Sequence, residues 1–179
     1  MNRLLAAVAV CAALATPALA ALKPGVKAPD FASTAFLGGK ATPFKLSEAL
    51  KKGPVVLYFF PAAYTKGCTA EAHEFAEATA EFNAMGATVI GVTAGQTERL
   101  ADFSKEHCRD KFAVAAVSKD TIKAYDAVLL LKPDLSDRTS YVIAPDGKVI
   151  FAMTNLGNPV EHVTKTKAAV KAWRARQPR

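Results

Sequence analysis

The stretch VVLYFFPAAYTKGCTAEAH, residues 55–73, places a cysteine between two different hydrophobic patterns. Residues 55–60 form a continuous apolar run rich in β-branched and aromatic side chains, which is typical of a strand buried on both faces of a sheet. Over residues 69–85 the apolar side chains recur every three or four positions, and this spacing indicates a helix with its glutamates, Glu71 among them, on the other faces. Cys68 therefore lies where a core strand ends and a helix begins.

The rest of the chain repeats this alternation of strand and helix. A hairpin or irregular lead-in is expected around Gly38-Gly39, and Pro-Asp-Gly at 145–147 predicts an antiparallel hairpin. Strands that alternate with helices pair in parallel. The order predicts the α/β class with a thioredoxin-like fold, a central mixed β-sheet flanked by helices with an N-terminal extension. The other strands are expected at residues 87–93, 112–117, 139–144 and 148–153, and the other helices at 97–108, 120–127 and 159–174.

The first twenty residues have the pattern of an export signal. Arg3 precedes an apolar run, and small residues at Ala18 and Ala20 predict cleavage after Ala20. The run is shorter than the roughly twenty apolar residues that a membrane span needs. Cys11 leaves with this leader, and Val10 before it does not suit lipidation. We expect residues 1–20 to be a signal peptide and residues 21–179 to form a single exported, periplasmic domain without stable membrane insertion.

The formal charge of +7 is concentrated near the C-terminus. The basic side chains on or after the expected last helix have no interleaved aromatic residues and no base-reading motif, so we expect a solvated helix face and no nucleic-acid partner. These residues are Lys165, Lys167, Lys171, Arg174, Arg176 and Arg179.

Two cysteines remain after the leader, Cys68 and Cys108. In an oxidising compartment a structural disulfide between them is one reading of the pair. A metal site with His73 and His107 is another, but spacings such as C-x2-C are missing, so we expect neither a metal nor another cofactor. Cysteine at a helix start is also suited to be a nucleophile, because free amides and the helix dipole stabilise its thiolate. The adjacent Lys66 and Gly67 predict that Cys68 is accessible.

The quoted stretch resembles the active-site motif of the peroxiredoxins, specifically the subgroup called bacterioferritin comigratory protein or peroxiredoxin Q. That motif reads Phe-x-Pro-x-x-x-Thr-x-x-Cys followed by Thr-x-Glu, and this chain matches it from Phe59 to Glu71. Further similarity covers residues 25–31, 117–120 and 138–147. The resemblance implies a thiol-dependent peroxidase that reduces hydrogen peroxide and organic hydroperoxides and is recycled by a thioredoxin-like reductant. We expect it to be a monomer or weak dimer.

The residues around Cys68 suit this chemistry. A thiolate that attacks one peroxide oxygen expels the other as hydroxide or alkoxide, so donors are needed where this charge develops. Thr65 offers a hydroxyl on the same turn, and the amides of Gly67 and Cys68 offer more. Pro61 lacks an N–H and is expected to wall the pocket. The plainer alternatives are a strand terminator for Pro61 and a helix cap for Thr65.

The resemblance assigns two more residues. In the family an arginine from a later strand stabilises the thiolate and orients the peroxide, and Arg138 matches it; the alternative is a surface charge. Many members of the subgroup carry a resolving cysteine five residues after the first, where this chain has His73. Others place it in the next helix, so we expect Cys108 to resolve Cys68 in an intramolecular disulfide, although it lies one turn beyond the corresponding Ser104. His107 and Arg109 beside it favour its thiolate.

Three alternatives to this two-cysteine mechanism stay open. A one-cysteine peroxidase would use an external thiol. A thiol–disulfide oxidoreductase of the same fold would carry C-x-x-C, where this chain has Thr65-x-x-Cys68. A non-catalytic redox sensor would pass its oxidation to a partner.

Overall fold

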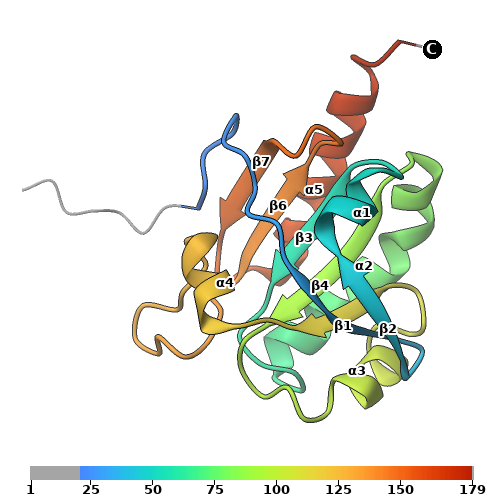
Figure 1. The fold of residues 1–179 in the computed structure, drawn as a ribbon. Helices are drawn as coiled ribbons and strands as arrows, with labels where there is room; N and C mark the ends of the chain where they lie inside the picture. The colour runs from blue at the N-terminus through green and yellow to red at the C-terminus, as the bar shows by residue number, and fades with distance from the viewer. Residues whose placement is uncertain (1–20, 179) are drawn as a thin grey trace, which may run out of the picture.

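The structure, a computed structural model, describes residues 21–178, so the expected signal peptide over residues 1–20 lies outside the described residues. A mixed seven-stranded sheet forms the centre of the fold (Figure 1). Its strands are β1 (Ala32–Leu37), β2 (Lys40–Lys45), β3 (Val55–Phe59), β4 (Thr88–Thr93), β5 (Ala113–Ala116), β6 (Thr139–Ile143) and β7 (Val149–Thr154). The helices are α1 (Leu46–Leu50), α2 (Lys66–Ala84), α3 (Leu100–Glu106), α4 (Lys119–Ala124) and α5 (Pro159–Arg174).

The sheet has the order β2-β1-β5-β4-β3-β6-β7. The neighbours β3, β4 and β5 pair in parallel, because helices α2 and α3 carry the chain back between them. Strand β6 is antiparallel to β3 and forms a hairpin with β7, as the Pro-Asp-Gly turn predicts. The N-terminal lead-in is a regular hairpin of β1 and β2. The thioredoxin-like arrangement expected from the sequence is therefore confirmed.

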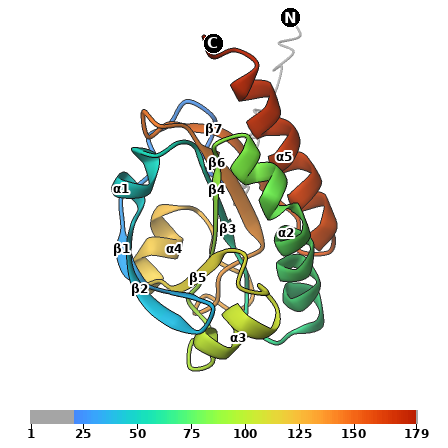
Figure 2. The same cartoon turned by 90° about the vertical axis from the view of Figure 1, so that its right-hand side faces the viewer.

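Strand β3 is buried on both faces and divides the core into two layers. Val55, Leu57 and Phe59 pack on one side with side chains of α1 and α4. Val56 and Tyr58 point to the other side, toward α2, α3 and α5. Figure 2 shows α1 and α4 on one face of the sheet, opposite α2 and α5. Within residues 21–178 we find no helix long and apolar enough to cross a membrane.

Two helix boundaries differ from the sequence prediction in ways that matter for the cysteines. Helix α2 begins at Lys66, three residues earlier than expected, so Cys68 lies inside its first turn. Helix α3 is shorter than the expected 97–108 and ends at Glu106. Arg109 and Asp110 follow with φ values of 51° and 57°. These left-handed conformations cannot continue a helix, so Cys108 lies in a turn.

Candidate active site

Cys68 is the third residue of α2, at the carboxyl end of β3. Thr65 has extended backbone angles at the N-cap position, and the N–H of Thr69 donates to the Thr65 carbonyl at 2.9 Å. This is the first hydrogen bond of the helix. The amides of Gly67 and Cys68 lie before it, so no helical carbonyl accepts from them. Free amides and the positive end of the helix dipole favour an anion at this position.

The Cys68 side chain is 1% exposed, which contradicts the accessibility that its neighbours suggested. Lys66 is exposed, but the helix turns Cys68 toward the sheet, where it joins the core cluster that contains Phe60 and Phe75. The sulfur is therefore held in a largely dry site. Electrostatic interactions with neighbouring groups are stronger there than in water.

Arg138 comes from far along the chain and reaches this sulfur. Because Phe59 at the end of β3 lies opposite Thr139, the residue before β6 is brought next to the start of α2. Arg138 Nη2 lies 3.7 Å from Cys68 Sγ, and Nε donates to the Leu156 carbonyl at 3.1 Å. Its side chain is buried, so the alternative of a surface charge is wrong. A buried guanidinium beside a sulfur favours the charged thiolate.

Glu71 is the site residue whose role the sequence analysis missed. It belongs to the Thr-x-Glu part of the motif, yet the helix pattern places it with the other glutamates on outer faces. In the structure it is fully buried, and its Oε2 forms an ion pair with Arg138 Nη1. Burial raises the pKa of Glu71, and the attraction of Arg138 opposes this rise. The signal for this role was the motif itself, since Glu71 follows Cys68 by one turn.

Gly67 leaves the space that the arginine occupies. A Cβ atom at this position would lie 2.8 Å from Arg138 Nη2, closer than packed atoms allow. The guanidinium can therefore reach Cys68 only because residue 67 has no side chain.

This close approach makes Gly67→Ala a selective test of the arginine. The added methyl group would push Nη2 away from the sulfur, and we expect peroxide reduction to slow by about tenfold, equivalent to about 1.4 kcal/mol. Alanine is the better helix former, which offsets part of the cost of displacing a buried guanidinium, so the melting temperature should change little. Peroxide consumption and a thermal melt measure the two effects. A fully active variant would show that the 3.7 Å contact is unimportant.

Thr65 and Pro61 lie on the loop that precedes α2. Thr65 Oγ1 donates to the Ala62 carbonyl at 3.1 Å and makes no cap hydrogen bond, so Thr65 occupies the cap position without capping the helix by its side chain. Its single hydroxyl hydrogen is used, which leaves lone pairs that can accept an O–H from a peroxide. The Pro61 carbonyl accepts from Thr93 Oγ1 at 3.2 Å and ties the loop to β4.

Tyr64 connects the same loop to α3. Its φ of 63° is unusual for a bulky residue. The ring packs edge-on against Phe103 at 5.4 Å and His107 at 5.2 Å, and the Arg99 guanidinium carbon lies 3.9 Å from its centroid. These contacts offset the cost of the backbone conformation. Nothing in the sequence analysis pointed to this residue.

Cys108 is fully buried and is not activated by its neighbours. Both it and Cys68 are free thiols. Burial, with a smaller contribution from Asp110, raises the pKa of the Cys108 thiol. The flanking charges were expected to favour its thiolate, but Arg109 pairs with Glu77 and the His107 ring packs against Tyr64. That expectation was wrong.

A surface cleft of about 430 Å³ separates the first turns of α2 from the end of α3. The exposed His73 lines it, at the position where many members of the resembled subgroup carry a second cysteine. In residues 21–178 no three His, Cys, Asp or Glu side chains are grouped to hold a metal ion. The cleft is lined by Lys66, Thr69, Ala70, His73, Glu74, Glu106 and His107.

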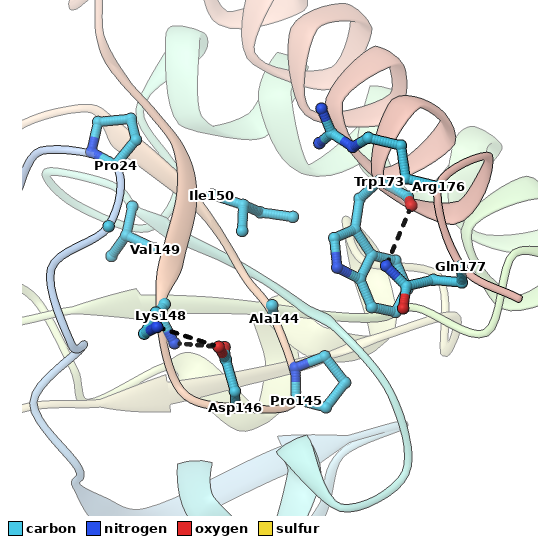
Figure 3. A pocket seen from close by; sticks show the side chains of 11 residues that line it. Pro24, Ala144, Pro145, Asp146, Lys148, Val149, Ile150, Trp173, Arg176 and Gln177 are labelled. Carbon is cyan, nitrogen blue, oxygen red and sulfur yellow. Dashed lines mark hydrogen bonds and ion pairs between the residues drawn. The ribbon is translucent and has the colours of Figure 1, made fainter.

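A larger cavity of about 570 Å³ lies elsewhere and contains none of the expected site residues. Figure 3 shows it between the side chain of Trp173 at the end of α5 and Lys148 and Val149 at the start of β7. It lies at the end of the sheet where β3 begins, whereas Cys68 lies beyond the opposite end, where β3 stops. This cavity is therefore separate from Cys68 and Arg138.

The thioredoxin-like fold and the buried cysteine, arginine and glutamate at the start of α2 agree with the thiol peroxidase expected from the motif around Cys68. Residues 24–152 match the AhpC/TSA family, and the chain belongs to that family. It is therefore a peroxiredoxin, as the motif around Cys68 predicted.

Three relatives illustrate the relationship. Rv1608c of Mycobacterium tuberculosis is 34% identical over 137 residues, which cover 75% of this chain and 88% of the relative. A chloroplastic peroxiredoxin Q of Sedum lineare is 30% identical over 124 residues, covering 69% and 66% of the two chains. The crystal structure of peroxidoxin BcpB from Mycobacterium tuberculosis superposes with a TM-score of 0.72 at 33% identity, covering 84% of this chain and 97% of the other. The names of the last two agree with the subgroup that the motif resembles.

Proposed function

We propose that this peroxiredoxin reduces hydrogen peroxide and organic hydroperoxides with Cys68 as the attacking residue. The observation that carries this proposal is the 3.7 Å approach of the buried Arg138 guanidinium to the Cys68 sulfur at the start of α2. The thiolate attacks one peroxide oxygen, the O–O bond breaks, and the other oxygen leaves as water or an alcohol after taking up a proton. The products are a sulfenic acid on Cys68 and the reduced peroxide.

The groups around the sulfur take separate parts in this step. Arg138 favours the thiolate and faces the negative charge that develops on the leaving oxygen. The amides of Gly67 and Cys68 donate to the bound peroxide, while Thr65 Oγ1 accepts its O–H because its own hydrogen goes to Ala62. Pro61 has no N–H to compete and forms a wall of the site.

We further propose that Cys108 resolves the sulfenic acid. Its thiol attacks the Cys68 sulfur, water leaves, and an intramolecular disulfide remains. Both cysteines belong to the same core cluster, which supports the pairing. Their burial and the raised pKa of Cys108 mean that the first turn of α2 and the turn at 107–110 must open before they react. A thioredoxin-like dithiol then reduces the disulfide.

Peptide mapping after one equivalent of hydrogen peroxide tests the two-cysteine mechanism. We expect a peptide that links Cys68 to Cys108 in the wild type. In Cys108→Ser the sulfenic acid should persist on Cys68 and oxidise further at higher peroxide doses. A wild type that keeps a sulfenic acid on Cys68 beside a free Cys108 would instead establish the one-cysteine mechanism with an external thiol.

A thiol–disulfide oxidoreductase is not supported, because Thr65 occupies the position where that chemistry needs its first cysteine. No turnover is therefore expected in an insulin reduction assay.

We also propose that the protein is exported to the periplasm and acts there as a monomer or weak dimer. The leader pattern of residues 1–20 supports export. N-terminal sequencing of protein from the periplasmic fraction should begin at Ala21, and an intact leader would contradict the proposal.

A further inference from the structure

His162 of α5 is a fully buried histidine that the reaction described above does not use. Its Nε2 lies 3.0 Å from the carbonyl oxygen of Asn155, and its Nδ1 lies 2.8 Å from Ser140 Oγ. A carbonyl oxygen can only accept, so Nε2 carries a hydrogen. In the neutral ring Nδ1 is then left with a lone pair, which accepts from the Ser140 hydroxyl.

The same Nδ1 faces the glutamate of the active site. It lies 3.9 Å from Glu71 Oε1, a buried oxygen that has no hydrogen-bond partner in the described part of the chain. The other oxygen of Glu71 is engaged with Arg138. If Glu71 is ionised, two electron-rich atoms face each other in a dry interior without a donor between them, which is unfavourable. One proton on Glu71 Oε1 removes this conflict, and after a small side-chain movement that proton can take the place of the Ser140 hydroxyl as the donor to Nδ1.

The charges at the site also favour one additional proton. A Cys68 thiolate and a Glu71 carboxylate would share the single positive charge of Arg138, and the second anion would be disfavoured by the first. With Glu71 protonated, Arg138 balances the thiolate alone.

We infer that His162 is a positioning residue for the peroxidase reaction. Together with Glu71 it holds one buried proton next to Arg138. Because this proton neutralises Glu71, the positive charge of the guanidinium acts on the Cys68 sulfur alone. The inference rests on the proposed role of Cys68. His162 never touches the peroxide, because it acts through Glu71 and Arg138.

The acid–base properties of the pair agree with this placement of the proton. Burial raises the pKa of Glu71 to about 8 against the attraction of Arg138. Burial also lowers the pKa of His162 to about 4, so the ring stays neutral at physiological pH. As pH rises through the pKa of Glu71, the carboxylate forms and competes with the thiolate for Arg138. The other titratable or charged groups whose fields act on this cluster are Cys68, Tyr58, Asp137 and Glu161.

The pH profile of Cys68 oxidation tests this inference in the full chain. Stopped-flow measurement with hydrogen peroxide should show a rate constant that falls several-fold on the alkaline side in the wild type. Glu71→Gln cannot ionise and keeps an amide oxygen for Arg138, so the rate that it retains should not fall on the alkaline side. His162→Leu removes the Nδ1 acceptor, so the protonated form of Glu71 loses its partner. The alkaline decrease of the rate constant should therefore move to lower pH by about one unit.

Two further variants separate positioning from simple stability. His162→Asn places an amide oxygen near the position of Nδ1 and should restore the wild-type profile. Val163→Ala removes a buried neighbour on α5 without touching the pair, and its profile should be unchanged. The inference is overturned if Glu71→Gln keeps the alkaline fall, or if His162→Leu leaves the pH profile unchanged, whatever its melting temperature. Absence of Cys68 oxidation in the wild type would instead refute the proposed function.

Discussion

Cys68→Ser is expected to abolish peroxide turnover, with a loss on the order of 10³-fold or more. Serine is nearly isosteric with cysteine, so the 1% exposed position should stay packed and the fold should persist. A hydroxyl does not ionise near neutral pH even beside a guanidinium, and an un-ionised oxygen does not attack a peroxide at a useful rate. Consumption of hydrogen peroxide with dithiothreitol as the recycling thiol measures this effect.

Cys108→Ser is the matched control, because it makes the same change at the other buried cysteine. Dithiothreitol can reduce a sulfenic acid on Cys68 directly, so this variant should retain substantial turnover in the same assay. If wild type and Cys68→Ser removed peroxide equally slowly, Cys68 would not be the attacking residue.

The sheet could be predicted because each strand carries its own signal. The apolar residues at 55–60, rich in β-branched and aromatic side chains, are typical of a doubly buried strand and contain β3, and the Pro-Asp-Gly turn at 145–147 predicts the β6–β7 hairpin. Helix ends were less predictable. The end of α3 at Glu106 depends on backbone conformations at Arg109 and Asp110 that no local pattern specifies.

The site was predictable only where the family motif covers it. The motif pointed to Cys68, Thr65 and Arg138, and the structure places Arg138 against the sulfur. Helix periodicity instead assigned Glu71 to a solvent-facing position, because a charged side chain is normally exposed. Its burial depends on a partner 67 residues away, which becomes a neighbour only when β6 pairs with β3. Contacts of this kind follow from strand pairing and not from local sequence.

Arg138→Met should strongly destabilise the fold in a pH-dependent manner. It removes the partner of the buried Glu71 carboxyl, and at a pH where that carboxyl is ionised the loss of such a pair from one side costs about 3–5 kcal/mol. Burial already raises the pKa of Glu71 above its unfolded value of 4.5, and loss of the guanidinium removes the interaction that lowers it. Above pH 4.5 the folded state binds more protons than the unfolded state in both proteins. The wild type stops losing stability near the Glu71 pKa of about 8, whereas the variant should go on losing it at higher pH. Urea unfolding at several pH values measures this.

Combining Arg138→Met with Glu71→Gln separates the structural from the chemical role of the arginine. The amide carries no charge, so the double variant should recover most of the stability and lose the pH dependence that Glu71 imposes. Its rate of Cys68 oxidation should stay about 10²- to 10³-fold below wild type, because nothing replaces the donors that face the sulfur and the leaving oxygen. A double variant with wild-type activity would mean that Arg138 serves only to neutralise Glu71. A single variant as stable as wild type above about pH 8 would mean that the Glu71 carboxyl stays protonated there without the arginine.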